Sequence, residues 1–361
     1  MSTLRELIAQ NPAFALAAGG LVAGFFFGAI VEATGFCAMG AVADMMTSGD
    51  TRRFRAWVLA IAAAILGAQA LETYGVVSLD QSMYRAPRLN WAGNILGGLM
   101  FGFGMSLAGG CASRNLVRAG AGDLRSALTL LVVGLLAYMT TGGILGPWRA
   151  SLETATAVAL PGGASSIADM AARAMGAESS PHAGMWLGLV IAGALLLYCF
   201  TSPAFRASRV HILAGLGVGA AVIAGWMLTG LAHDDMALAP QAPLSLSFVK
   251  PTGDALEWLE RFTALGLPSF GAASVFGTLL GAFVSALIAG RLRLATFADT
   301  GDTLRNLGGA VLMGVGGVLA LGCTIGQGVS GLSTLALGSI LAFLGIIGGA
   351  VAGMKALERF A

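Results

Sequence analysis

Long apolar runs dominate the chain and alternate with short stretches that hold most of the charged residues. Several runs approach or exceed the length of about 20 residues that a helix needs to cross a bilayer. They predict about nine membrane spans, near residues 13–33, 56–71, 92–108, 126–145, 183–201, 210–231, 268–289, 307–321 and 333–353. The pattern therefore predicts an all-α polytopic membrane protein, with residues 1–361 in a single transmembrane domain.

Composition supports this class. Hydrophobic residues make up 57% of the 361 residues and charged residues only 11%. The 54 glycines would weaken soluble helices, but small residues let membrane helices approach closely, and broken helices are tolerated where protein covers them. The net charge is +2 and no basic tract is interleaved with aromatic residues, so we expect no nucleic-acid partner.

Basic residues are concentrated in alternate connections between the spans. The positive-inside rule places such connections in the cytoplasm. We therefore predict an external N-terminus and a cytoplasmic C-terminus. The residues that carry this prediction are Arg52, Arg53, Arg55, Arg114, Arg118, Arg125, Arg206, Arg209, Arg291, Arg293, Arg305, Lys355 and Arg359.

Two of the connections on the opposite side are long. Residues 146–182 and 232–267 are rich in Pro, Ser, Ala and acidic residues, which is typical of loops. Each has room for a short surface helix, near residues 167–175 and 255–265. We interpret both connections as external caps or interaction surfaces.

The chain also contains an internal repeat. Superposing Cys111 on Cys323 without a gap aligns six further pairs, namely Asn94 with Asn306, Gly97 with Gly309, Gly102 with Gly314, Gly104 with Gly316, Gly110 with Gly322 and Val117 with Val329. A weaker match sets Gly24 and Gly28 on Gly277 and Gly281. The halves cover roughly 13–145 and 268–353, with the spans in 183–231 between them, and the odd offset in crossings predicts an inverted repeat.

Three cysteines, Cys37, Cys111 and Cys323, each lie in a glycine-rich interruption of an apolar run. The spans that end near residues 108 and 321 are only about 25 Å long, less than the hydrocarbon thickness, so the thiols should lie within the membrane. Short re-entrant helices that begin at Ser113 and near Thr324 to Gln327 would direct partial positive charge at an anion. The candidate site comprises Cys37, Cys111, Cys323, Gly110, Gly322, Arg114 and Gln327.

The chemistry of the thiols limits the class of ligand that the site would bind. A thiol is a weak donor with a polarizable surface, which suits a charged sulfur atom better than sulfate oxygens. We therefore predict a sulfur-containing oxyanion. Cys199, in an ordinary apolar run, is interpreted as a packing residue. We expect no cofactor and no metal, because there is no CxxC pair and His182, His211 and His233 lie in loops or at a span edge.

Other polar residues near membrane depth are interpreted one by one. Glu32 either orients the Cys37 loop or relays protons, or it pairs with a nearby arginine. Arg118 is interpreted as a topology signal. Asn94 and Asn306 are expected to cap short helices.

The segments around Cys37 (GFCAMG), Cys111 (GGCASRN) and Cys323 (LGCTIGQG) resemble the YeeE/YedE family of bacterial inner-membrane sulfur-compound transporters, over nearly the whole chain. The resemblance implies short helices that meet at the membrane centre, thiosulfate as substrate, and a pathway along Cys37, Cys111 and Cys323. It also implies a cytoplasmic sulfurtransferase of the TusA or rhodanese type as a partner. A related branch of the family is associated with selenium metabolism.

We therefore predict a transport protein and not an enzyme. One alternative is a membrane sulfurtransferase, in which a cysteine thiolate attacks the outer sulfur of thiosulfate, keeps it as a persulfide and releases sulfite as the S–S bond breaks. Arg114, three residues after Cys111, favours that alternative because a neighbouring cation activates a thiol. A third hypothesis is a structural subunit without a pathway of its own.

Overall fold

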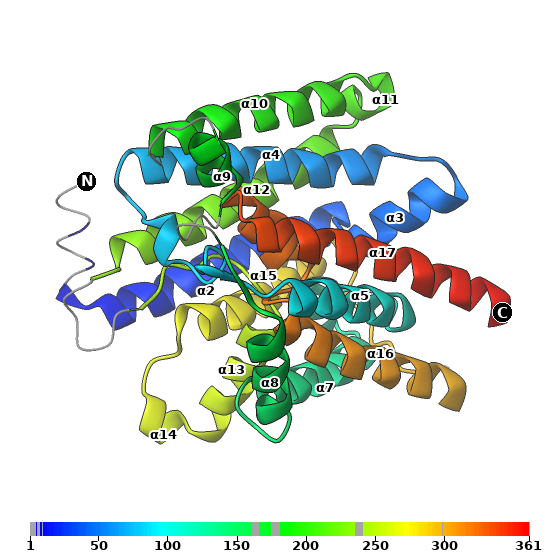
Figure 1. Ribbon diagram of the computed structural model, residues 1–361. Helices are drawn as coiled ribbons and strands as arrows, with labels where there is room; N and C mark the ends of the chain where they lie inside the picture. Colours follow the sequence, from blue (N-terminus) through cyan, green and yellow to red (C-terminus); the bar gives the residue numbers. More distant parts are fainter. Residues whose placement is uncertain are drawn as a thin grey trace.

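Long helices form the body of the protein (Figure 1). The computed structural model describes residues 5, 8, 10–160, 166–174, 181–234, 241–297 and 299–360. The long helices are α2 (Pro12–Thr34), α4 (Arg52–Thr73), α5 (Trp91–Leu107), α7 (Leu124–Thr141), α10 (Pro181–Phe200), α12 (Arg209–Leu231), α15 (Phe270–Ile288), α16 (Thr300–Leu319) and α17 (Leu337–Phe360). The polytopic all-α class is confirmed.

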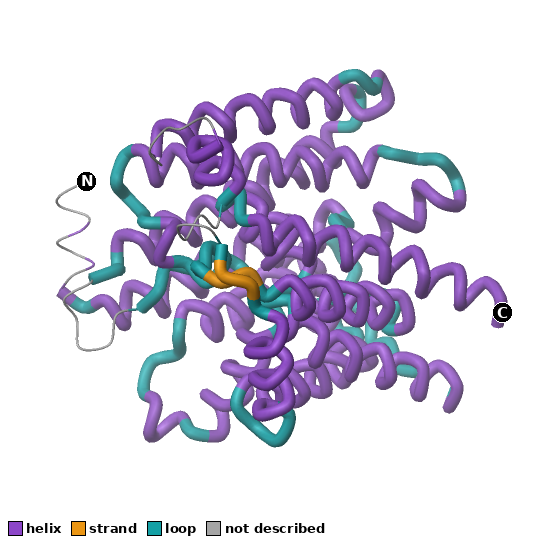
Figure 2. Tube along the Cα trace, viewed as in Figure 1, coloured by secondary structure: helices purple, strands orange, loops and turns teal. Residues whose placement is uncertain are grey.

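Shorter elements connect the long helices. Three of them follow cysteines: α3 (Ala38–Thr47), α6 (Ala112–Gly120) and the π-helical η3 (Gly326–Gly331) within a helical stretch at 324–333. The others are η1 (Leu79–Gln81), α8 (Gly146–Thr156), α9 (Ile167–Ala174), α11 (Pro203–Arg206), α13 (Lys250–Glu260) and α14 (Phe262–Leu265). Figure 2 shows the strand pair β1 (Arg88–Leu89) and β2 (Val158–Ala159), which is antiparallel with Arg88 opposite Ala159.

Among the described residues, 8 helical segments are long and apolar enough to cross a membrane. Two of them, Pro12–Thr47 and Trp91–Gly120, combine a long helix with the short helix that follows. One of the nine predicted spans, 307–321, coincides largely with the second half of α16 and is not among the 8. The polar first turns of α16, with Asp302 and Arg305, leave it only a short, glycine-rich apolar part.

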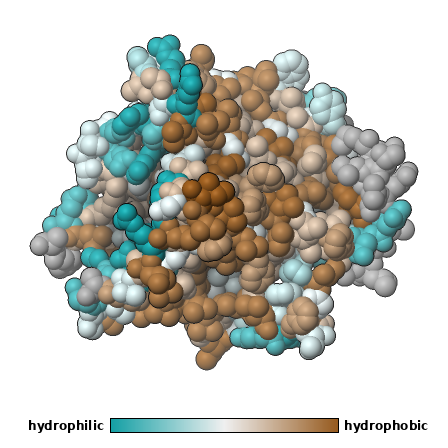
Figure 3. All heavy atoms as spheres, turned by 180° about the vertical axis from the view of Figure 1, so that it is seen from behind, coloured by the Kyte–Doolittle hydropathy of each residue, from teal (hydrophilic) through white to brown (hydrophobic). Residues whose placement is uncertain are grey.

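The surface is arranged as a membrane protein requires. Seen from behind, a broad hydrophobic area lies between margins that hold most of the polar residues (Figure 3). The α3–α4 connection, α11, the start of α16 and the C-terminus all lie at one end of the molecule, and the start of α2 lies at the other (Figure 1). These connections hold many of the basic residues predicted to face the cytoplasm, whereas the orientation itself remains a prediction.

Glycines bring α5 and α16 into backbone contact. A Cβ added to Gly97 would lie 2.6 Å from the Gly316 carbonyl oxygen, and one added to Gly104 would lie 2.6 Å from that of Gly309. The contacts are reciprocal, because a Cβ on Gly309 or Gly316 would meet the carbonyl of Gly104 or Gly97. The two helices run antiparallel, which is the relation that inversion requires of repeat-matched helices.

The weaker sequence match has a different geometry. Gly24 and Gly28 of α2 lie against the backbone of Ser274 and Thr278 in α15, so these helices run parallel. The contacts are again reciprocal, since Gly277 and Gly281 lie against Leu21 and Phe25. This match therefore reflects a symmetric parallel pair, and inversion does not account for it.

Only part of the two long connections is surface structure. Helix α9 confirms the short helix expected at 167–175 up to Ala174, and residue 175 lies outside the described residues. In the second connection, helix begins at Lys250, earlier than expected. Residues 244–249 form neither helix nor strand and enter the core, where Leu246, Phe248 and Val249 are fully buried. The prediction that 232–267 is a cap is wrong for this segment.

The tight α2–α15 crossing yields a stability prediction. In Gly24→Ala, the new methyl group overlaps the Ser274 carbonyl, and such overpacking costs about 1–3 kcal/mol. We expect a lower midpoint of thermal unfolding in detergent. Gly193→Ala in α10 is the control, because nothing lies within 4 Å of the added methyl group. Equal melting of the two variants would contradict this packing.

Candidate functional site

Three helix breaks share one backbone geometry. Each long helix ends at a residue in the left-handed conformation, the cysteine follows two residues later, and a short helix begins at the next residue. The left-handed residues are Gly35 (φ 68°), Gly109 (φ 66°) and Leu321 (φ 59°). Leu321 is the repeat equivalent of Gly109, and a non-glycine residue in this conformation costs about 1–2 kcal/mol. The break is therefore held by its surroundings.

Each thiol lies at the start of a short helix. The sulfur of Cys37 accepts a hydrogen bond from the Gly40 amide at 3.4 Å, and that of Cys323 accepts one from the Gly326 amide at 3.3 Å. Cys111 has no such bond, and its sulfur lies 3.2 Å from the Ser113 hydroxyl oxygen. The helix starts predicted after Cys111 and Cys323 are present, and a further short helix, α3, begins after Cys37. Their amides give the sulfur atoms a partly positive environment.

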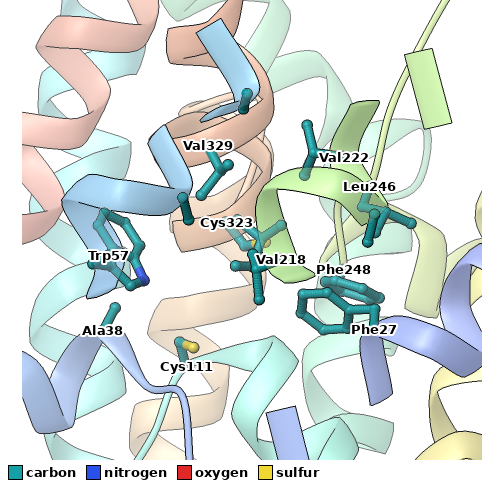
Figure 4. Packing of buried hydrophobic residues seen from close by; sticks show 14 of the residues in the cluster. Phe27, Ala38, Trp57, Cys111, Val218, Val222, Leu246, Phe248, Cys323 and Val329 are labelled. Carbon is teal, nitrogen blue, oxygen red and sulfur yellow. The ribbon is translucent and has the colours of Figure 1, made fainter. Parts of the chain in front are cut away.

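The structure brings the three thiols to one region. Cys111 lies within electrostatic range of both Cys37 and Cys323. Figure 4 shows Cys111 and Cys323 in the same buried cluster. Both are essentially inaccessible, whereas Cys37 is half-buried. Cys199 lies elsewhere, where its thiol donates to the Arg55 carbonyl at 3.3 Å.

Repeat-related carboxamides support two of the breaks. Asn115 donates to the carbonyl oxygens of Gly110 at 2.8 Å and Cys111 at 3.2 Å. Gln327, its repeat equivalent, donates to the carbonyl of Ala320. The sequence analysis selected Gln327 but missed Asn115. The repeat alignment that pairs Gly110 with Gly322 also pairs these two residues and would have found it.

The two glycines of the candidate site have a steric role. A Cβ on Gly322 would lie 3.2 Å from Cγ of Gln327, and one on Gly110 would lie 3.3 Å from Cγ of Arg114. Neither position leaves easy room for a side chain. Gly110 and Gly322 therefore let the side chains of the following helix fold back over the break.

Basic side chains lie near Cys37. Arg114 donates to the Val31 carbonyl at 3.4 Å and lies in electrostatic range of Cys37. Arg118, interpreted from sequence as a topology signal, also donates to the Gly109 carbonyl at 3.3 Å. Glu32 pairs with Arg291 at 2.9 Å, which matches the second of its two predicted roles.

Asn94 and Asn306 do not cap helices. The N-cap residues of α5 and α16 are Asn90 and Asp299, whose side chains accept the amides of the first turns. Asn306 instead accepts a hydrogen bond from Thr129 at 3.0 Å. The expected caps were wrong because the helices begin earlier than the apolar runs.

A cavity of about 410 Å³ approaches Cys323 from the side of α13. It is lined by Tyr84, Ser245, Ser247, Lys250 and Gly322, among others. Burial raises the pKa of Tyr84, so its phenol stays protonated and can donate at neutral pH. Sequence reasoning missed this cavity because its walls come from the connection interpreted as a surface loop.

Segment 244–249 forms one wall of this approach. The Leu246 carbonyl accepts a hydrogen bond from Ser330 at 2.7 Å, and Phe248 packs against Phe27 with ring centroids 4.8 Å apart and the rings tilted by 30°. The amide of Phe248 interacts with Cys323. The segment therefore adds a further backbone donor beside this thiol. In the described part of the chain, no cluster of three or more His, Cys, Asp or Glu residues is placed to hold a metal ion.

Apolar helices that break and continue as short helices around buried backbone groups are typical of membrane transporters. The chain belongs to the family described as Sulphur transport, whose sequence profile matches residues 33–352. The protein is thus a multi-pass membrane transporter of sulfur compounds.

Named relatives support this assignment. A protein named thiosulfate transporter TsuA from Spirochaeta thermophila is 28% identical over 338 residues, which cover 90% of this chain and 93% of the relative. A thiosulfate transporter TsuA from Escherichia coli is 27% identical over 337 residues, 88% of this chain and 87% of its own. The probable transporter YedE of E. coli is 33% identical over 103 residues, 28% of this chain and 23% of its own.

Unequal burial of the thiols predicts unequal reactivity. Cys37 should react with N-ethylmaleimide well before Cys111, Cys199 and Cys323, which are at most 1% exposed. Peptide mass spectrometry over a time course in mild detergent measures this order. In denaturant, all four should react at similar rates. Labelling of Cys111 or Cys323 as fast as Cys37 in the folded protein would show that the centre is open.

Proposed function

We propose that the protein takes up thiosulfate, or a closely related sulfur oxyanion, through a central pathway lined by Cys37, Cys111 and Cys323. The observation that carries the proposal is the convergence of three thiols, each at the start of a short helix and close to backbone amides. The names of the two long relatives support the choice of substrate.

The arrangement suits an anion with a terminal sulfur. Amides at helix starts compensate negative charge without a fixed cation at the centre. The thiols offer weak donors and polarizable surface to the sulfur end. Conduction requires sites that bind well enough for entry and weakly enough for exit, and a series of such moderate contacts meets both needs.

The order of the sites suggests a route. The anion would enter the cavity beside α13, pass Gly322 to Cys323, then reach Cys111 and finally Cys37, which is half-buried and lies near Arg114. In this proposal the protein lies in a bacterial inner membrane. The N-terminus is periplasmic and the C-terminus is cytoplasmic, in accord with the positive-inside rule.

A cytoplasmic sulfurtransferase of the TusA or rhodanese type would then receive the sulfur. Such a partner would bind on the Cys37 side of the pathway, where basic side chains can attract an acidic protein or the anion itself. A selenium analogue of the substrate would fit the same soft contacts, and competition in uptake assays ranks the candidates.

Cys111 is the residue that most directly tests the pathway. In Cys111→Ser, size and hydrogen bonding are kept while the polarizable sulfur is lost, so we expect thiosulfate uptake into proteoliposomes to fall about tenfold or more. Cys199→Ser is the matched control and should transport normally, because Cys199 is not one of the three thiols at the helix breaks and its thiol bonds to the Arg55 carbonyl. Normal uptake by well-expressed Cys111→Ser would contradict the pathway.

A second measurement separates transport from sulfur transfer. After the purified protein is exposed to thiosulfate, mass spectrometry should find no persulfide on Cys111, and radiolabelled thiosulfate should arrive intact inside vesicles. A persulfide on a pathway cysteine together with released sulfite would instead favour a membrane sulfurtransferase. Absence of uptake by the reconstituted protein alone would favour a subunit that needs a partner.

A further inference from the structure

Two buried hydrogen-bond donors near the cysteines have no partner among the described residues. They are the indole nitrogen Nε1 of Trp57 and the hydroxyl of Thr324. Trp57 is 3% exposed and Thr324 is fully buried. Both line one cavity of about 10 Å³, whose other walls are apolar. A buried donor without an acceptor is unfavourable, so a pair beside one cavity calls for a ligand.

This small cavity lies between all three helix breaks. Ala38, which follows Cys37, forms part of its wall, as does Thr324, which follows Cys323. Met105 completes the set, because its carbonyl accepts the Gly110 amide at 2.9 Å in the Cys111 break. In Figure 4 the indole nitrogen lies on the side of the Trp57 ring turned toward Cys111 and Cys323.

Stacking fixes the direction of the Trp57 donor. The indole lies between Phe343, at 5.1 Å between ring centroids and 19° between planes, and Phe36, at 6.4 Å and 20°. Gly328 lies against the ring edge, where a Cβ would clash. The ring has little freedom to turn its N–H toward another acceptor.

We propose that Trp57 and Thr324 form a donor pair that binds the oxygen atoms of the transported sulfur oxyanion at the centre of the pathway. The pair would hold the oxygen end of the anion while its terminal sulfur faces the thiols. This inference rests on the proposed function. It assigns the polar end of the substrate to side chains outside the cysteine motifs.

The cavity must enlarge to admit the anion. The element next to Thr324 is η3, a stretch of π-helix whose residues are fully buried or nearly so. Such π-helical turns often occur at functional sites. A shift of η3 away from α4 would widen the space between Thr324 and Trp57.

Matched variants isolate the two donors. Thr324→Val removes the hydroxyl at nearly constant volume, and Thr324→Ser keeps it. Replacing Trp57 by 3-benzothienylalanine exchanges the N–H for sulfur and preserves the ring shape. The same replacement at Trp186, which is 69% exposed, is the control. We expect Thr324→Val and the Trp57 replacement each to weaken thiosulfate binding about tenfold, and both controls to bind normally.

A direct readout comes from the indole N–H itself. In protein labelled with ¹⁵N-tryptophan, the Trp57 resonance is the one lost on its replacement. Titration with thiosulfate should shift this resonance in the native protein and in Cys199→Ser. A structural role for Trp57 would not produce this shift.

The outcomes separate this inference from the proposed function. If the native protein transports thiosulfate and Cys111→Ser does not, while Thr324→Val binds normally or the Trp57 resonance stays unmoved, the donor pair is wrong and the pathway stands. If the native protein neither binds nor transports thiosulfate, the proposed function fails first. Weaker binding by the variants with a shifted resonance in the native protein supports the pair.

Discussion

The structure depends on one constraint: backbone groups that leave a helix inside a membrane must find partners within the protein. At the breaks, the Gly110 amide bonds to the Met105 carbonyl at 2.9 Å and the Gly322 amide to the Gly317 carbonyl at 2.7 Å. The side chains of Asn115 and Gln327 take up further carbonyls. Because these backbone groups at the Cys111 and Cys323 breaks find hydrogen-bond partners within the protein, the chain can place thiols and helix starts in the core instead of at the surface.

Close helix packing makes that arrangement possible. Where α5 and α16 cross, glycines bring the two backbones together, so the breaks that end these helices are held by a rigid crossing. These reciprocal contacts explain why most of the identical pairs in the repeat alignment are glycines. Most side chains can diverge between the halves, whereas a position that touches a carbonyl oxygen cannot gain a Cβ. Because the contacts are symmetric, both halves need glycine at matching positions, and the repeat can be recognised in the sequence.

Much of this could be predicted from the sequence, and what could not has physical reasons. Span positions and the short helices after Cys111 and Cys323 follow from apolar length and glycine-rich interruptions, which are local. The burial of Leu246 and Phe248 is not local, because a segment in a polar, proline-containing connection gives no sign that it enters the core. Trp57 has an ordinary position in an apolar run, and only its stacking and its unpartnered N–H single it out.

The halves match in backbone and differ in charge, and this difference bears on transport. Arg114 is matched by Gly326, so the helix after Cys111 has a guanidinium, in electrostatic range of Cys37, at a position where the helix after Cys323 has glycine. Next to Cys323 the donors are backbone amides, and the cavity beyond Gly322 adds hydroxyl groups together with the basic side chains of Lys250 and Arg149. If the proposed pathway holds, a full charge at its centre would bind a divalent anion too tightly for release. In the proposed pathway, basic side chains therefore lie toward both ends, and neutral donors near the buried thiols keep the contacts moderate enough for release.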